Sequence, residues 1–191
     1  MTFSKETQKF LGLNELSSNQ EIIKSIITNF PGLRFHEIKK ETGLANGTLQ
    51  HHLGTLEKSE IISTEYDQST PRYYSQEIIE TDKIIIKRLS QNTTSKIIKV
   101  LLKKECQNFT QLVKFTKKSP GTVSIYKNKL LKDGIIVGDT NNCKCSKNVS
   151  HSIIKYRLTD PERILFLVDE YGKTSLQHSA DNLADVFLSL K

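Results

Sequence analysis

The chain contains an internal repeat, which constrains the fold more than any other feature of the sequence. When the sequence is shifted by 74 residues without a gap, residues 23–62 lie over residues 97–136, and ten positions are identical. The identical pairs are Ile23/Ile97, Phe35/Phe109, Lys40/Lys114, Thr42/Thr116, Gly47/Gly121, Thr48/Thr122, Leu56/Leu130, Lys58/Lys132, Ile61/Ile135 and Ile62/Ile136. Because self-similarity at a fixed offset indicates a repeated structural unit, the sequence predicts two copies of one small domain.

Two short helices separated by a tight turn are predicted in the first copy. Residues 35–42 form the first helix and residues 48–58 the second, whose leucines at 49, 53 and 56 fall on one face. Gly43 suits the positive φ of a turn, and Asn46 is predicted to cap the second helix.

A helix and a β-hairpin flank this pair. Residues 20–29 predict a preceding helix, with Ser18 and Asn19 as its cap and Pro31-Gly32 as its end. After the pair, residues 61–64 and 72–74 predict two strands joined by a polar loop. Helix, turn, helix and hairpin together are the plan of a winged helix-turn-helix.

This stretch resembles the ArsR/MarR-like winged-helix transcriptional regulators over about forty residues. The resemblance is carried by residues 32–38, 47–53, 56–58 and 61–62. It implies a mainly α fold with small β-hairpin wings (α+β) and two tandem winged helix-turn-helix domains, an arrangement similar to that of archaeal regulators. It further implies sequence-specific binding of double-stranded DNA and regulation of transcription.

Five segments follow from the repeat and from the helical patterns. They are an N-terminal extension (1–18), winged helix domain 1 (19–75), a linker helix (76–90), winged helix domain 2 (91–159) and a C-terminal helical dimerisation segment (160–191). In the last segment, apolar residues recur with 4-3-4-3 spacing at Leu176, Ala180, Leu183, Phe187 and Leu190. This seam predicts a homodimer, with packing against the second domain as the alternative.

Positive charge is concentrated in the middle of the chain. The net charge is +7, yet residues 76–159 carry +11, residues 1–75 carry −1 and residues 160–191 carry −3. A basic middle favours a polyanionic partner, although solvated lysine faces would give the same count. The chain has no run of 18 apolar residues and no signal-peptide pattern, which predicts a cytoplasmic, nucleoid-associated protein without membrane contact.

The resemblance also assigns candidate DNA contacts. In the first domain, it implies base reading by Asn46, Thr48, Gln50 and His51, backbone contacts by Thr55 and Lys58, and a wing contact by Arg72. In the second domain, the matching contacts are Thr122, Ser124, Lys127, Asn128 and Lys129. Lys127 departs from the repeat because it occupies the position of Leu53.

A weak metal signal lies in the second wing. Cys143, Cys145 and His151 form a partial ligand set for which zinc is the ion to consider, and a Cys143–Cys145 disulfide is the alternative. Otherwise no cofactor is expected. The sequence has neither a phosphate-binding loop nor a catalytic constellation, which predicts that the protein is not an enzyme.

Two further functions remain open beside DNA binding. Winged helices also serve as protein-interaction modules, for example in RNA polymerase-associated subunits and chromosome-segregation factors. A metal or redox sensor acting through the cysteine-containing wing is the other alternative.

Overall fold

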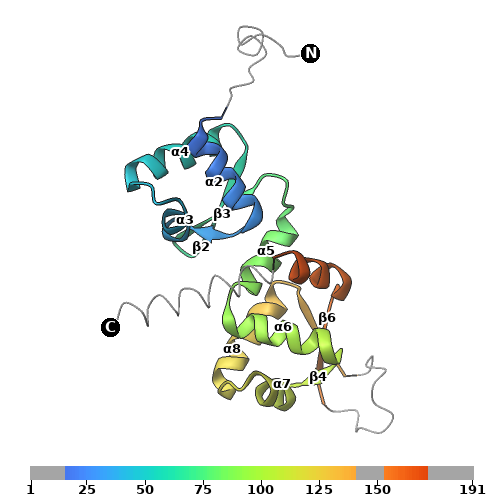
Figure 1. The fold of residues 1–191 in the computed structure, drawn as a ribbon. Coiled ribbons are helices and arrows are strands. Elements are labelled where there is room, and N and C mark those ends of the chain that lie inside the picture. Colours follow the sequence, from blue (N-terminus) through green and yellow to red (C-terminus); the bar gives the residue numbers. More distant parts are fainter. Residues whose placement is uncertain (1–15, 141–152, 172–191) are drawn as a thin grey trace. The chain divides into compact units, whose positions relative to one another are not determined.

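The computed structural model describes residues 16–140 and 153–171, and the chain divides into two compact units between Ile78 and Ile79. Helices and small antiparallel sheets make up both units (Figure 1), so the α+β fold class is confirmed. No helix within the described ranges is long and apolar enough to cross a membrane. The predicted seam at 176–190 lies outside the described residues.

Residues 16–78 of the first unit contain three helices and three strands. Its elements are α2 (Ser18–Asn29), β1 (Leu33–Arg34), α3 (Phe35–Thr42), α4 (Asn46–Lys58), β2 (Ile62–Asp67) and β3 (Thr70–Ser75). The cap of α2 is Ser17 rather than the predicted Ser18 or Asn19; Gln20 N donates to Ser17 Oγ, and Ser17 N donates to Gln20 Oε1. Gly43 has φ +66° and ends α3, as predicted for the turn between the helices.

The strands of the first wing are longer than the sequence predicted. β2 and β3 pair antiparallel from Ile62↔Ser75 to Asp67↔Thr70, which leaves only Gln68 and Ser69 to make the turn. Gln68 takes the left-handed conformation this turn requires, with φ +61°. The two-residue β1 joins the other edge of β3 and gives the order β1-β3-β2. β1 was not predicted, because two residues carry no periodic signal.

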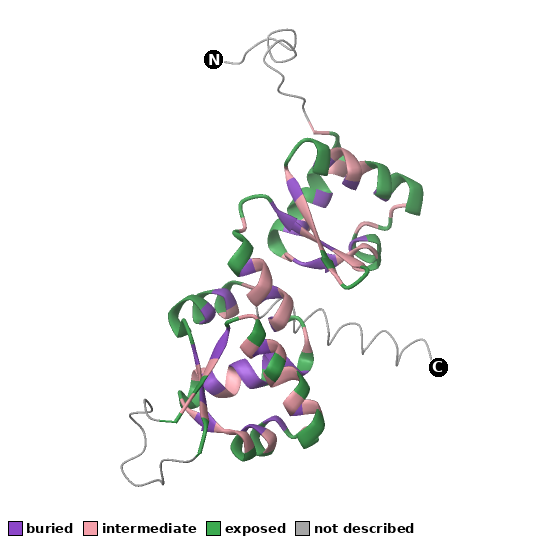
Figure 2. Cartoon of the chain, turned by 180° about the vertical axis from the view of Figure 1, so that it is seen from behind, coloured by how far each residue is buried: buried purple, intermediate pink, exposed green. Residues whose placement is uncertain are grey.

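Aliphatic side chains from the three helices and from β1 and β2 form the core of the first unit. Figure 2 colours the buried stretches of the chain purple. The buried members of the core are Ile23, Ile27, Leu33, Ile38, Leu49, Leu53, Leu56 and Ile62. Burial of such side chains contributes about 1.5–3 kcal/mol each relative to exposure, so this core is the main support of the helix pair.

Gly32 connects the turn after α2 to strand β3 of the wing through hydrogen bonds. Its N–H donates to the Tyr73 carbonyl oxygen at 2.8 Å, and its own carbonyl oxygen accepts a hydrogen bond from Arg72 Nη1, also at 2.8 Å. Its φ is +82°, and a Cβ placed here would lie 3.2 Å from the ring and the hydroxyl oxygen of Tyr74, a side chain with no exposed surface. Glycine therefore meets two requirements at this position: left-handed backbone and close approach to an aromatic ring.

Gly32→Ala is expected to destabilise the first unit by about 1–3 kcal/mol, because it adds backbone strain and crowds Tyr74. Urea titration followed by hydrogen exchange of peptides within residues 18–75 measures the loss. Gly54→Ala is the matched control, since Gly54 lies inside α4 with no atom within 4 Å of the added Cβ. The control should be neutral or stabilising, by up to about 1 kcal/mol. Equal losses in both variants would contradict this account of Gly32.

The second unit repeats the element order of the first after one additional helix. Its elements are α5 (Glu80–Leu89), α6 (Asn92–Lys104), β4 (Gln107–Asn108), α7 (Phe109–Thr116), α8 (Pro120–Lys132), β5 (Ile136–Asp139), β6 (Lys155–Leu158) and a helical segment over residues 161–171. The sheet has the order β4-β6-β5, equivalent to β1-β3-β2. Ser119 caps α8, and Pro120 is its first residue.

Two ion pairs attach the flanking helices of the second unit. In α5, Arg88 Nε binds the Asp133 carboxylate at the end of α8. Asp82 is buried and accepts a bidentate pair from Arg163, whose Nε lies 3.0 Å from Asp82 Oδ1. Ile86 and Leu89 are buried as well. Helix α5, predicted as a linker over residues 76–90, therefore belongs to the packed second unit.

Candidate nucleic-acid interface

One side of helix α4 packs in the core of the first unit, and the rest of its surface carries exposed polar residues. Its leucines at positions 49, 53 and 56 are buried in the core. Asn46, Thr48, Gln50, His51 and Lys58 are exposed. Core packing thus fixes the rotation of α4 about its axis. The four predicted base-reading side chains consequently lie near the helix N-terminus, on its exposed surface.

The N-terminus of α4 differs from the sequence prediction in its cap and in its first residue, which was predicted at position 48. Ala45 is the N-cap residue and makes no side-chain cap hydrogen bond, while Asn46 is already the first helical residue. The predicted capping role of Asn46 is therefore wrong. Its amide group is not used for capping, and as a donor and acceptor it can pair with a base edge or a phosphate.

Two other polar residues of α4 are partly engaged within the helix. Thr55 Oγ1 donates to the His51 carbonyl oxygen at 2.9 Å, so its hydroxyl proton is already used. The His52 ring is half-buried and meets the His51 ring edge-on, with centroids 5.5 Å apart. His51 is thus the histidine of the pair that faces outward.

Arg72 is not the exposed wing contact that the resemblance implied. Only 4% of its surface is exposed, and its Nη1 is bonded to the Gly32 carbonyl oxygen. Its Nε lies 3.6 Å from Asp67 Oδ2 near the end of the hairpin. The guanidinium group holds β3 to the turn after α2. We therefore assign Arg72 a structural role in place of the predicted wing contact.

Helix α8 of the second unit presents a more mixed surface than α4. Asn128 is exposed, and Thr122 and Ser124 are partly exposed. Thr122 Oγ1 lies 2.8 Å from the capping Ser119 Oγ, so these two hydroxyl groups share a hydrogen bond. Ile125 is 59% exposed and offers only an apolar contact. The outer surface of α8 therefore has fewer hydrogen-bonding groups than that of α4.

Lys127 lies against the wing rather than projecting into solvent. Its Nζ is 3.2 Å from Tyr156 Oη, and it lies 4.8 Å from the Tyr156 ring centroid and 5.8 Å from that of Phe109. Tyr156 itself is buried in β6. The lysine stem occupies the place of Leu53, and its ammonium group is held by aromatic rings. This arrangement corrects the prediction of Lys127 as a free DNA contact.

One feature of α8 was missed in the sequence. Lys129 Nζ lies 5.0 Å from the centroid of the Tyr126 ring, which places a cation and an aromatic side chain together on this helix. Their spacing of three residues was the available signal, because such positions are neighbours on a helical surface. Lys129 remains a predicted phosphate contact, now oriented by Tyr126.

The metal prediction falls outside the described part of the chain. Cys143, Cys145 and His151 all lie in residues 141–152. Within residues 16–140 and 153–171, no group of three or more histidine, cysteine or acidic residues is arranged to hold a metal ion. Cys106 is disulfide-bonded, which leaves a single further cysteine in the chain and so removes the Cys143–Cys145 alternative. The zinc alternative stays a prediction.

Comparison with known families supports the assignment of the first unit. Residues 17–86 match the family model of an HVO_0163 N-terminal HTH domain. The match covers α2, the α3–α4 pair, the first wing and most of α5. No curated protein matches the chain. The fold, the exposed face of α4 and this match define the first unit as a DNA-binding helix-turn-helix domain.

Proposed function

We propose that the protein is a sequence-specific transcriptional regulator with two winged helix-turn-helix domains in tandem. The exposed N-terminal half of α4 is the observation that carries the proposal: Asn46, Thr48, Gln50 and His51 are all exposed there, on a helix whose rotation is fixed by buried leucines. An exposed amide and imidazole near a helix N-terminus suit the hydrogen-bonding groups of the major groove. The protein would act in the cytoplasm, at the nucleoid.

The second unit supports the tandem arrangement through its order of elements. Its α6, α7 and α8 precede a β-hairpin, and its sheet order matches that of the first unit. Exposed lysines on α7 and α8 would supply phosphate contacts; they are Lys114 and Lys132. We propose that the first unit selects sequence and the second unit mainly adds affinity. The regulator would be of the ArsR/MarR-like type that the sequence resembles.

We further propose a homodimer formed through the C-terminal residues. The 4-3-4-3 apolar spacing at residues 176–190 supports it. A dimer with twofold symmetry would bind two half-sites separated by whole turns of DNA. Selection from random duplex DNA tests this directly, because a dimeric reader enriches paired motifs. Enrichment of single motifs would contradict the dimer while leaving base reading intact.

Ile125 favours a second candidate function for α8. A side chain that is 59% exposed and fully apolar at the centre of a recognition helix suits a protein surface as well as a thymine methyl group. The alternative is a winged-helix interaction module that attaches to the transcription machinery. Ile125→Ser separates the two, since DNA affinity should fall if Ile125 contacts DNA and should stay unchanged if Ile125 contacts a protein.

Gln50→Ala is expected to relax sequence choice at one base pair of the selected site. Loss of a bidentate contact removes about 1–3 kcal/mol of discrimination, a factor of about 5–150 at that pair. Competition binding with a panel of single-base variants of the site measures it. Gln76→Ala is the matched control, because Gln76 is exposed outside the helix pair. A uniform loss of affinity across the panel would refute a base-reading role.

A further inference from the structure

A surface hollow of about 320 Å³ lies between α6 and the end of α7, in the second unit. Its lining residues are Lys96, Lys99, Val100, Lys103, Phe115, Thr116 and Lys117. No residue of α8 or of the wing strands lines it. The hollow is therefore distinct from the proposed DNA-reading surface of this unit.

Four of the seven lining residues are lysines, and none of them pairs with a carboxylate in the described part of the chain. Three of these lysines, at positions 96, 99 and 103, recur on one face of α6 by their spacing of three and four residues. Lys117 approaches from the end of α7. Like charges gathered without acidic partners repel one another, and a bound anion would relieve this repulsion.

One of the lining lysines, Lys99, has a lowered pKa. Burial lowers the pKa of the Lys99 ammonium group, and the neighbouring charge of Lys103 lowers it further. The basic groups that face Lys99 from its own helix and from α7 are Lys96, Lys103 and Lys117. An anion in the hollow would favour the charged form of Lys99 and restore its pKa upward.

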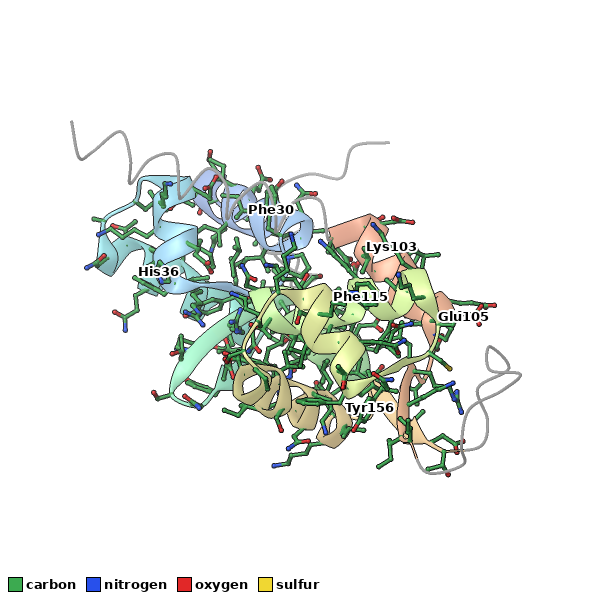
Figure 3. The ribbon with its side chains drawn as sticks, turned by 90° about the horizontal axis from the view of Figure 1, so that it is seen from below. Phe30, His36, Lys103, Glu105, Phe115 and Tyr156 are labelled. Atoms are coloured by element: carbon green, nitrogen blue, oxygen red, sulfur yellow. The ribbon has the colours of Figure 1, made fainter. Side chains whose placement is uncertain are left out.

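The floor of the hollow is apolar. Val100 and the exposed edge of Phe115 contribute to it, and Figure 3 labels Phe115 beside Lys103. Lys104 Nζ also lies 3.8 Å from the centroid of the Phe115 ring, which brings another cation to this cluster. A phosphodiester backbone gains little from contact with an apolar surface, whereas a ring or a short alkyl chain would pack on it.

We propose that this hollow binds a small organic anion with an apolar body, such as an aromatic phosphate or carboxylate, as an effector. The lysines would hold the anionic group, and Val100 and Phe115 would contact the apolar part. The volume lies at the lower end of the range for small-molecule pockets, which limits the ligand to about one or two rings. The regulatory part of this proposal rests on the proposed DNA-binding function.

Lys117 lines the hollow and also lies in the turn before α8, so a ligand in the hollow can affect the position of α8. It caps α7 in the left-handed conformation, with φ +54°, and its N–H donates to the Val113 carbonyl oxygen at 3.2 Å. Only Lys118 and the N-cap Ser119 separate it from the first residue of α8. A ligand that holds Lys117 would therefore act on the turn that positions α8.

Isothermal titration with 1-naphthyl phosphate, in the absence of DNA, tests the site itself. The full chain should bind 1-naphthyl phosphate at least about tenfold more tightly than 1-naphthol or inorganic phosphate at equal ionic strength. Of the three compounds, only 1-naphthyl phosphate has both an anionic group for the lysines and a ring for Val100 and Phe115. Lys99→Gln/Lys103→Gln should weaken binding by at least about tenfold, and so should Phe115→Ala. The matched control is Lys24→Gln/Lys39→Gln, which removes the same charge from exposed positions of the first unit. Equal binding by all variants would overturn the proposal.

A second measurement tests the regulatory part. Affinity for duplex DNA should change at least about threefold in saturating 1-naphthyl phosphate, and the Lys99→Gln/Lys103→Gln variant should lose this response. Ligand binding with an unchanged DNA affinity would overturn the effector role. If duplex DNA simply displaced the ligand in direct competition, the hollow would belong to the DNA interface and the proposal would fail. Because the titration needs no DNA, failure of DNA binding leaves the site itself testable.

Discussion

Affinity for duplex DNA is expected to fall by about 10³–10⁵ between 50 mM and 200 mM salt. Neutralising six to ten phosphates releases that number of condensed counterions, and the slope of log affinity against log salt follows from it. Residues 76–159 carry a net charge of +11, the source of these contacts. Fluorescence anisotropy with a labelled duplex over a salt series gives the slope.

Single lysine substitutions locate the contacts that produce this slope. Lys114→Gln and Lys132→Gln each remove one exposed lysine from α7 or α8, and each should reduce the slope by about 1. Lys127→Gln should change it much less, because its ammonium group is held by Tyr156. Lys24→Gln, in α2, serves as the control. A slope near zero for the unmodified chain would reject phosphate binding and favour the protein-interaction alternative.

Arg72→Ala is expected to destabilise the first unit by about 2–4 kcal/mol while leaving base selectivity unchanged. The substitution removes a charged hydrogen bond to the Gly32 carbonyl oxygen and leaves Asp67 without its partner. It also opens space in a nearly closed site, since Arg72 is only 4% exposed. Urea unfolding followed by hydrogen exchange in residues 18–75 reports the loss.

Arg72→Lys and Lys58→Ala complete the Arg72 test. A lysine keeps the charge but lacks the forked donor geometry, so a substantial part of the loss should remain. Lys58→Ala changes an exposed predicted DNA contact and should leave stability within about 0.5 kcal/mol. Should Arg72→Ala instead preserve stability and weaken DNA binding tenfold, the original wing-contact assignment would be correct.

Local signals predicted the helix pair of the first unit well. The bounds of α3 agree with the prediction, because the helix begins at Phe35 and is ended by Gly43. The buried leucines of α4 follow from spacing alone. The match to an HTH family then confirms the helix-turn-helix class that this pattern indicated.

Interactions between distant positions account for most of what the sequence did not predict. Arg72 looked like an exposed wing residue because its acceptor, the carbonyl oxygen of Gly32, lies forty residues earlier. Lys127 looked like a phosphate contact because its partner Tyr156 follows it by 29 residues. β1 and β4 each form only by pairing with a later strand. Hydrophobic patterns and helix or strand propensities do not identify such partners, so the local sequence does not predict that a charged side chain is buried.

The fully paired first wing has a thermodynamic consequence. β2 and β3 are hydrogen-bonded along their whole length, up to a turn of two residues. A wing that is ordered before it meets DNA loses little conformational entropy on contact, and it buries no additional apolar surface through coupled folding. When DNA binding is followed by calorimetry, contact with the first wing should therefore contribute only a small heat-capacity change, as expected for the docking of two preformed surfaces.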